Sequence, residues 1–290
     1  MLRTASQTGQ PHLTIKEIKD IAIPIKTKIQ SLCYKIFTES VKFESQSKQL
    51  YKEAEELLLQ ELGLLDYKPK HQLTFETTKK EVEEVKRFDS EYFQPKYKEI
   101  IKKIESYKSG FDTVENVLIF NKKNFFPMAN ELYHYIPLAR VSSNGEIDIP
   151  EKEHGKDLPT RARRKVKNGE ILLSSISGSL ETSALIGEEH SGFIASNGFY
   201  VFKSDMINSE TLLILFKSQI MIELLKKISK GAILGSYDLS SFGKINIPLI
   251  DCKVQKEIAS KTQESHRLRK ESKELLEDAK RKVEEEIEKA

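Results

Sequence analysis

The amino-acid sequence predicts an α+β protein in which one β-rich domain is joined to two long helices. Two charged stretches, residues 27–62 and 251–290, repeat their apolar residues with helical spacing. Between them, short runs such as EILLSSI and GFYVFK alternate with Gly, Asn and Ser turns, which is typical of strands. The two charged stretches also resemble each other in sequence, so we expect them to adopt the same structure.

Composition bounds the protein class without assigning a function. A chain of 290 residues with 38% hydrophobic residues can bury one sizeable core and carry further elements. Charged residues make up 31%, yet the formal net charge is only +3, so any signal for nucleic-acid binding must be local. Two cysteines, Cys33 and Cys252, are too few for a disulfide framework and fit a reducing compartment.

Metal and membrane sites are not indicated by the sequence. The six histidines are scattered and form no metal-binding motif with each other or with the cysteines. No apolar run approaches the ~20 residues of a membrane span, and the N-terminus lacks a signal-peptide core. We therefore expect no metal, no membrane contact and a cytoplasmic location.

Five segments follow from the changes in texture along the chain. Thr14 and Glu17 form a capping box that opens a short helix before an extended piece at Ile21–Pro24. The segments are an N-terminal piece (1–24), a long helix that ends at Gly63 (25–63), a connector with a possible short helix at 81–87 (64–87), a β-rich domain that includes one strongly apolar helix over 209–230 (88–250), and a second long helix (251–290).

The first long helix carries two stripes with a seven-residue period, which predicts a coiled-coil seam. One stripe is apolar: Ile29, Ile36, Phe43, Leu50 and Leu57. The second stripe, four residues on, is largely small: Cys33, Ser40, Ser47, Ala54 and Glu61. Small residues let two helix backbones approach closely.

The second long helix repeats the first. With Gln30 aligned on Gln255, eight positions are identical, and four of them belong to the small stripe. This favours packing of the helices on each other or on copies of themselves, although charged helices also resemble one another in general. The predicted interface residues are Ile29, Ile36, Ser40, Phe43, Ser47, Leu50, Ala54, Leu57, Ser265, Leu268, Ser272, Leu275 and Ala279.

The repeat extends to the residues before each helix. KDIAIPI precedes the first helix, where GKINIPL precedes the second, and TGQPHLT stands where LGSYDLS stands in the later copy. We interpret residues 1–24 as the tail of a unit whose complete version runs from about residue 88 to residue 287.

The order of these pieces resembles the specificity (HsdS) subunits of type I restriction–modification systems. The matching stretches are FDSEYFQPKY, YIPLARVSSNGEI, NGEILLSSISGS, ASNGFYVFK, KGAILGSYDLSSFGKINIPL and VQKEIA…LLEDAKRKVEEEIE. The resemblance implies a target-recognition domain at 88–250 that reads half of a split duplex DNA target. It also implies antiparallel conserved helices that separate two such domains and dock methyltransferase subunits. A helix of 34 residues, such as 29–62, measures about 50 Å at ~1.5 Å per residue.

The sequence departs from that family at its start, because it begins inside the last segment of a first recognition domain. Residues 1–24 would then be the tail of that domain, in a half-subunit or a shuffled fragment. A half-subunit could restore the missing domain by pairing with a second copy, so we consider a homodimer with the repeated helices as its seam.

A basic run is the strongest candidate for DNA contact. Residues 156–170 contain six cations and two anions. Such runs are often solvated faces, but within a recognition domain they can neutralise phosphates, and arginine can bind the guanine edge. On the family resemblance, the residues assigned to DNA here are Arg161, Arg163, Arg164, Lys165 and Lys167.

Polar turns supply weaker candidates for DNA contact. Their residues also serve as ordinary turn formers, and that alternative stays open. Arg140, Ser142 and Asn144 follow a predicted strand, whereas the others lie in separate turns: Ser179, Asn197, Lys230, Ser236 and Tyr237.

The leading hypothesis is a non-catalytic DNA-recognition subunit. No glycine-rich cofactor loop, Walker motif or amino-methyltransferase tetrapeptide occurs, so we expect no enzymatic activity. The implied partners are double-stranded DNA, methyltransferase subunits and restriction–translocase subunits. S-adenosylmethionine and ATP would bind those partners, and this chain would need no cofactor. The alternatives are a coiled-coil scaffold and a silent recombination cassette.

Overall fold

The computed structural model of the chain describes residues 14–19, 27–231 and 235–288. The extended piece expected at 21–24 lies outside these residues. The chain forms two compact units: residues 1–46 with 267–290, and residues 47–266. The two long helices, α2 (Thr27–Glu61) and α9 (Cys252–Glu288), each contribute to both units, and their bounds lie close to those predicted.

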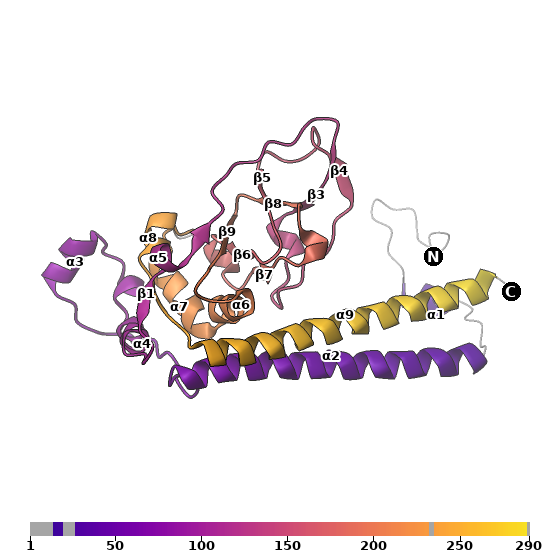
Figure 1. Cartoon of the computed structure of the whole chain (residues 1–290), viewed down its shortest axis with the longest axis horizontal. Coiled ribbons are helices and arrows are strands. Elements are labelled where there is room, and N and C mark those ends of the chain that lie inside the picture. Colours follow the sequence, from indigo (N-terminus) through magenta and orange to yellow (C-terminus); the bar gives the residue numbers. More distant parts are fainter. Residues whose placement is uncertain (1–13, 20–26, 232–234, 289–290) are drawn as a thin grey trace. The chain divides into compact units, whose positions relative to one another are not determined.

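The first unit consists of paired helices. It contains α1 (Ile15–Lys19) and the parts of α2 and α9 that fall within its residues. Figure 1 shows α2 and α9 side by side and antiparallel. The Ser40 and Ser272 hydroxyls lie 2.9 Å apart, and each also donates to the other residue's carbonyl oxygen, at 3.1 Å from Ser40 and 2.9 Å from Ser272. A hydroxyl that reaches a backbone carbonyl of the neighbouring helix requires close backbones.

The second unit contains the same kind of helix packing. The Ser47 and Ser265 hydroxyls lie 3.0 Å apart, and Ser265 donates to the Ser47 carbonyl oxygen at 2.8 Å. The four serines are nearly inaccessible to solvent. The small stripe therefore forms the centre of the seam. Of the apolar stripe only Ile36 is buried, and the other members are half-buried: Ile29, Phe43, Leu50 and Leu57.

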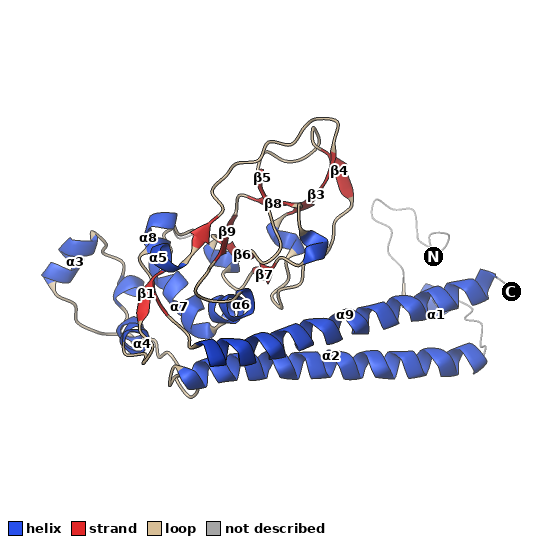
Figure 2. Cartoon of the chain, viewed as in Figure 1, coloured by secondary structure: helices blue, strands red, loops and turns tan. Residues whose placement is uncertain are grey.

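The rest of the second unit is a mixed α and β domain (Figure 2). Its helices are α3 (Lys79–Val85), α4 (Pro95–Glu105), α5 (Val114–Val117), α6 (Ser209–Lys217), α7 (Gln219–Ile228) and α8 (Leu239–Gly243), with 3-10 turns η1 (Ser90–Phe93), η2 (Leu138–Arg140), η3 (Ser177–Ser179) and η4 (Glu188–His190). Its strands are β1 (Phe111–Thr113), β2 (Ile119–Phe120), β3 (Leu132–Ile136), β4 (Lys152–His154), β5 (Ala162–Lys165), β6 (Ile171–Ser174), β7 (Ser183–Leu185), β8 (Ile194–Ser196), β9 (Phe199–Lys203) and β10 (Asn246–Pro248).

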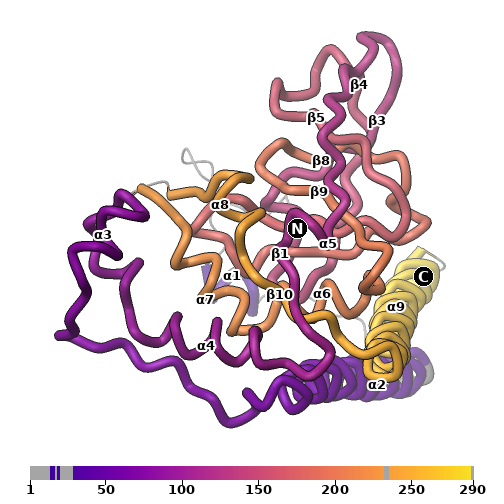
Figure 3. Tube along the Cα trace, turned by 60° about the vertical axis from the view of Figure 1, so that its left-hand side comes forward, coloured from indigo at the N-terminus to yellow at the C-terminus, as the bar shows by residue number. Residues whose placement is uncertain are grey.

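The strands form three sheets, with the orders β1-β10, β2-β9-β6-β7 and β4-β3-β8-β5. All pairs are antiparallel except β3 with β8. Although β1 and β10 are far apart in sequence, they lie side by side, as Figure 3 shows. The domain thus closes just before α9 begins.

The β2-β9-β6-β7 sheet is buried on both faces. Ile171 and Leu173 belong to the main core with α6, α7 and α8, whereas Leu172 belongs to a second core cluster that also contains Ile136 and Ala195 from the other four-stranded sheet. A sheet covered on both sides needs a continuous apolar strand rather than an alternating one, which is why β6 reads ILLS.

The prediction of a single apolar helix over 209–230 is wrong, because the structure contains two helices there, α6 and α7. Ser218 between them has extended backbone angles, and its hydroxyl caps α7 by accepting from the Met221 N–H. Its own N–H donates to the carbonyl oxygens of Ile214 and Leu215 and so completes α6. One serine ends the first helix and starts the second.

Two helices precede the sheets. The helix predicted inside the connector is α3, which is capped by a capping box between Thr78 and Glu81. The sequence did not lead us to predict α4, which begins at Pro95 and buries Tyr97, Ile100 and Ile104. Its apolar residues recur at helical spacing, so the signal was present.

Candidate nucleic-acid interface

Strand β5 carries much of the predicted basic run. It pairs with β8, and a bulge lies between Ala162 and Arg164. Ala162 is fully buried, Arg163 and Arg164 are half-buried, and Lys165 is exposed. A bulge interrupts the in–out alternation of a strand. It therefore leaves Arg163 without a paired residue in β8.

The segment of residues 121–125 lies beside β5 and adds cations that were not predicted from the sequence. The Phe125 N–H donates to the Arg163 carbonyl oxygen at 2.8 Å, and the Asn121 side chain donates to the Lys165 carbonyl oxygen at 3.0 Å. The Arg164 guanidinium donates to the Asn124 side-chain oxygen. These bonds bring Lys122 and Lys123 next to the predicted run. The two adjacent lysines of NKKN, which follow the apolar run VLIF, were the available signal.

A concave surface results, with a volume of about 830 Å³. Four lysines line the hollow: Lys122, Lys123, Lys165 and Lys167. Together with Arg163 of β5 we term them the basic surface. Lys203 lines the same hollow and is paired with Asp205 at 3.5 Å. Among the described residues, none of these five cations has a carboxylate oxygen within 4.0 Å. Their charge is therefore available to an external anion.

The one carboxylate that lines this hollow is held by hydrogen-bond donors. Glu170 is 7% exposed, and its oxygens accept from the Lys167 N–H at 2.8 Å and from the Asn121 side chain at 3.2 Å. A buried carboxylate needs such donors. Glu170 therefore fixes the turn that presents Lys167, and it is turned inward rather than toward the surface.

Aromatic rings orient two of the cations. The Lys165 ammonium lies 5.4 Å from the centre of the Phe125 ring, and the Arg163 guanidinium lies 4.9 Å from that of Phe126. These are cation–π distances. Burial lowers the pKa of the Arg164 guanidinium, which nevertheless stays charged at neutral pH because its ordinary pKa is so high.

Arg161 precedes β5 and Asn197 follows β8, and the two residues lie together. The Asn197 N–H donates to the Arg161 carbonyl oxygen at 2.8 Å, and both side chains are exposed. The structure thus unites two candidates from different parts of the sequence.

The turn with Arg140, Ser142 and Asn144 uses its polar groups internally. Arg140 pairs with Asp148, and the Ser142 hydroxyl donates to the Asn144 side-chain oxygen. Lys217 of α6 donates to the Ser143 carbonyl oxygen and, at 3.3 Å, to that of Glu181. The turn is therefore fastened to α6 and to the turn before β7, and it shares no lining residue with the basic surface.

Tyr237 requires a correction. Its side chain is 2% exposed, and its hydroxyl donates to the Ser174 carbonyl oxygen at 2.6 Å. Burial holds its pKa well above the ordinary value. An aromatic ring inside the main core cannot contact DNA, so the predicted role is wrong. The Ser179 hydroxyl is also occupied, because it lies 2.7 Å from the Ser174 hydroxyl.

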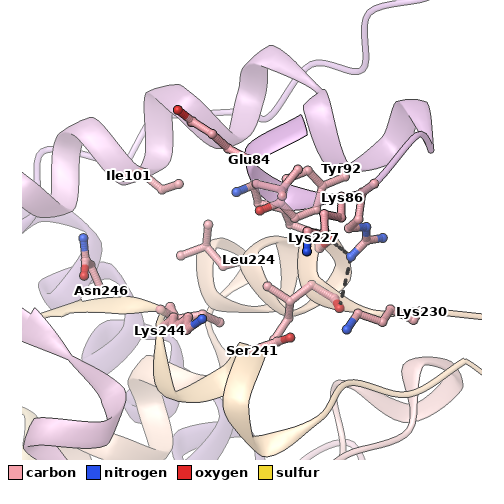
Figure 4. A pocket seen from close by; sticks show the side chains of 14 residues that line it. Glu84, Lys86, Tyr92, Ile101, Leu224, Lys227, Lys230, Ser241, Lys244 and Asn246 are labelled. Carbon is pink, nitrogen blue, oxygen red and sulfur yellow. Dashed lines mark hydrogen bonds between the residues drawn. The ribbon is translucent and has the colours of Figure 1, made fainter. Parts of the chain in front are cut away.

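Lys230 and Ser236 lie in a different part of the unit and bond each other through their backbones. Lys230 lines a second basic pocket of about 540 Å³ with Lys86, Arg87, Lys227 and Lys244 (Figure 4). The Lys230 ammonium lies 2.9 Å from an Asp238 carboxylate oxygen. Hydrogen bonds from the Ser241 N–H and, to a smaller extent, from Lys230 lower the pKa of Asp238 to about 2.

Tyr92 also lines this second pocket. The Lys227 ammonium and the Arg87 guanidinium lie 4.3 and 4.6 Å from the centre of its ring. Arg87 also binds Asp89 and the carbonyl oxygens of Lys227, Ile228 and Ser229 at the end of α7. Burial, with repulsion from Arg87 and Lys98, lowers the pKa of Lys227. Much of this cluster therefore serves to fasten η1 to α7.

Metal-binding and membrane-spanning features are not found in the described residues. No group of three or more His, Cys, Asp or Glu side chains among them could hold a metal ion. None of the helices formed by those residues has the length and hydropathy of a membrane span.

Comparison with known proteins finds the fold but no relative in sequence. No family model matches the chain, and neither does any curated protein. A crystal structure of the S subunit of a type I restriction–modification system from M. genitalium is similar over 96% of this chain and 66% of that one, with 14% identity and a TM-score of 0.50.

Two further structures match over 60% of this chain and 46% of theirs. One is the HsdS subunit from Thermoanaerobacter tengcongensis, with 19% identity and a TM-score of 0.46. The other comes from work on complex assembly and conformational transition of the type I R-M system, with 21% identity and a TM-score of 0.49. The chain spans between about half and two thirds of the length of these proteins. The expected likeness to specificity subunits is confirmed as a likeness of fold, carried by the M. genitalium structure.

Proposed function

We propose that the chain recognises duplex DNA as a specificity subunit of a type I restriction–modification complex and performs no chemistry itself. The observation that carries the proposal is the basic surface, five cations without carboxylate partners among the described residues. The shared fold supports it independently.

Duplex DNA fits this surface on physical grounds. Phosphates release counterions when cations neutralise them, and lysines without a carboxylate partner give up no internal ion pair when they bind. Arg163 can also form two hydrogen bonds with a guanine edge in the major groove. Lysines would position the duplex, and base contacts by arginine would contribute to sequence preference.

The partners would supply the chemistry. The long helices α2 and α9 would dock methyltransferase subunits, to which S-adenosylmethionine would bind. Restriction–translocase subunits would bind ATP. The chain itself would hold no cofactor, and its domain would read one half of a bipartite target.

A groove in the first unit supports pairing with a second copy. Cys33, Tyr34 and Phe37 of α2 and Leu276 and Val283 of α9 line it, with a volume of about 560 Å³. Phe37 is 56% exposed and Tyr34 72% exposed. We propose that the globular domain of a second copy covers this groove, because the repeat-equivalent helix surface in the second unit is covered by such a domain.

The equivalent positions are given by the sequence repeat. Val283 corresponds to Leu58, Ala279 to Ala54 and Cys33 to Ile258. Leu58, Ala54 and Ile258 are fully buried in the main core of the second unit. Sedimentation of the full chain tests the pairing: a dimer that Phe37→Glu dissociates would support it, and a wild-type monomer at micromolar concentration would refute it.

DNA binding is tested by substituting the basic surface. We expect Lys165→Ala/Lys167→Ala to weaken binding to a mixed-sequence duplex in fluorescence anisotropy. The slope of log K against log salt should become shallower by about 0.9 for each phosphate that is no longer neutralised. The matched control is Lys253→Ala/Lys256→Ala, which removes two exposed lysines of α9. Equal affinities and slopes for both double variants would refute a role for the basic surface.

The wider role is tested by co-expression with a methyltransferase subunit from the same genome, followed by sequencing of the methylome. A methylated split motif would establish target recognition. A palindromic motif would indicate two copies of this chain, and an asymmetric motif would indicate a different partner half. A stable chain without any methylation would favour a scaffold or a silent cassette.

A further inference from the structure

Two apolar side chains point outward next to the basic surface. Phe126 is 68% exposed and Met128 is 65% exposed, whereas Phe125 and Pro127, which alternate with them, are half-buried. The alternation is that of an extended chain, in which residues two apart face the same side. The segment therefore presents a phenyl ring and a thioether to solvent. Single exposed apolar residues are common, but two in register require an explanation.

Hydrogen bonds to the backbone hold this segment in place. The Phe125 N–H donates to the Arg163 carbonyl oxygen at 2.8 Å, and the Met128 N–H donates to the Tyr133 hydroxyl at 3.2 Å. The Met128 carbonyl oxygen accepts from the Glu131 N–H at 3.2 Å. A segment fixed at both ends loses little conformational entropy when it binds, so its side chains are pre-organised.

Gly155 completes the support. A Cβ atom at this position would lie 2.1 Å from the Met128 carbonyl oxygen and 3.0 Å from the Pro127 Cβ. Only a residue without a side chain allows the two segments to approach so closely. The place of Met128 thus depends on a close backbone approach.

The surroundings indicate what covers these side chains. The Arg163 guanidinium lies over the Phe126 ring, and Lys122, Lys123 and Lys165 belong to the adjoining basic surface. An apolar protein partner would leave these cations unpaired at the interface, which costs free energy. Duplex DNA has the matching chemistry, with phosphates outside for the cations and stacked bases inside for the apolar pair.

We infer that Phe126 and Met128 form an apolar wedge that inserts between base pairs of the bound duplex and kinks it. The inference rests on the proposed function and adds the way in which the duplex is deformed. Wedges of this kind unstack a base step and bend DNA by about 20–90°. Pyrimidine–purine steps unstack most easily, so the wedge would add a preference for such a step at a position without hydrogen-bonded readout.

The test uses a duplex selected from a randomised library by the full chain together with its methyltransferase partner. Bending is measured by energy transfer between dyes at the duplex ends, and unstacking by 2-aminopurine fluorescence at successive positions. We expect a fluorescence increase at one step on binding of the wild-type chain. Phe126→Ala/Met128→Ala should abolish this increase and weaken binding by about tenfold, the effect expected from removing one ring that stacks on a base.

Three further variants separate the possible outcomes. Phe88→Ala is the matched control, because Phe88 is 90% exposed, lies outside the basic surface and should leave bend and affinity unchanged. Gly155→Ala keeps both wedge side chains but displaces their backbone, so it should reduce the 2-aminopurine signal. Lys165→Ala/Lys167→Ala should weaken binding while the remaining complex stays bent.

A bend and a 2-aminopurine signal that persist in Phe126→Ala/Met128→Ala would overturn the wedge and leave the proposed function intact. If those substitutions instead weaken only the binding of the methyltransferase partner, the two side chains form a protein-docking surface, which also overturns the wedge. If no duplex is enriched from the library, the proposed function fails and the wedge fails with it.

Discussion

Helices α2 and α9 contribute to both units, so their packing in the first unit can be compared with their packing in the second. In both units, serines of the small stripe face each other across the seam and are nearly inaccessible to solvent. On the flank of the seam the units differ. Leu58 is fully buried in the second unit, whereas its repeat equivalent Val283 is 36% exposed in the first.

This difference separates two levels of packing. The seam depends only on the two helices, because serine hydroxyls of one helix bond serines of the other and the small side chains permit a close approach. The flank depends on the globular domain, because Leu58, Ala54 and Ile258 become core only where that domain covers them. Within the described residues, the repeated sequence therefore produces the same serine contacts between the helices in both units, but a buried core on the flank of the helices in the second unit only.

The largest expected effect is a difference in the free energy of unfolding between variants at the equivalent positions Leu58 and Val283. Leu58→Ala should lower the free energy of unfolding by about 2–5 kcal/mol, because it leaves a cavity in a packed core. Val283→Ala, at the equivalent position, should change it by less than about 0.5 kcal/mol at a protein concentration at which the chain is monomeric. Under the proposed pairing a second copy covers Val283, so the loss should grow at a concentration at which the chain is a dimer. Urea denaturation of the full chain at the two concentrations measures both variants, and a loss in the monomer as large as that of Leu58→Ala would contradict the difference between the two units.

A smaller effect tests whether the seam is the same in both units. Ser47→Ala should cost about 0.5–1.5 kcal/mol, because the buried Ser265 hydroxyl loses the Ser47 hydroxyl as a partner but keeps its bond to the Ser47 carbonyl oxygen. Ser47→Ala/Ser265→Ala removes both hydroxyls and should cost less than the sum of the single changes. The matched cycle is Ser40→Ala with Ser272→Ala. A coupling energy present in one unit and absent from the other would contradict the common seam.

The smallest effect concerns pH and belongs to the second unit. Burial lowers the pKa of His190, whereas the described residues of the first unit include no histidine. Its folded pKa lies below the unfolded value of about 6.5, so its full contribution is present above pH ~6.5. Stability falls as the pH drops toward the folded pKa, since the unfolded chain binds the proton more tightly.

Unfolding in urea at about pH 7.5 and about pH 5.5 measures this dependence. His190→Asn should reduce the difference between the two conditions, whereas His154→Asn, at an exposed position, should leave it unchanged. An unaltered difference in His190→Asn would assign the pH dependence to other groups.

The candidate site was only partly predictable. The basic run at 161–167 is local in sequence, so its charge is evident without a structure. Lys122 and Lys123 join it through bonds between residues about forty positions apart, such as Phe125 with Arg163. Tyr237 illustrates the opposite error, since a tyrosine in a polar turn carries no local sign that its ring is buried among the aromatic residues Tyr200 and Phe242.

The sequence alone determined the two long helices, their repeat, the small stripe that becomes the seam and the basic run of β5. Each of these depends on spacing within one element or on short-range charge. Tertiary structure alone decided that Ser218 divides the apolar helix, that Lys122 and Lys123 join the basic surface, and that Leu58 is core whereas Val283 lines a groove. Those outcomes depend on which distant segment covers a residue, and burial by a distant segment leaves no mark in local spacing.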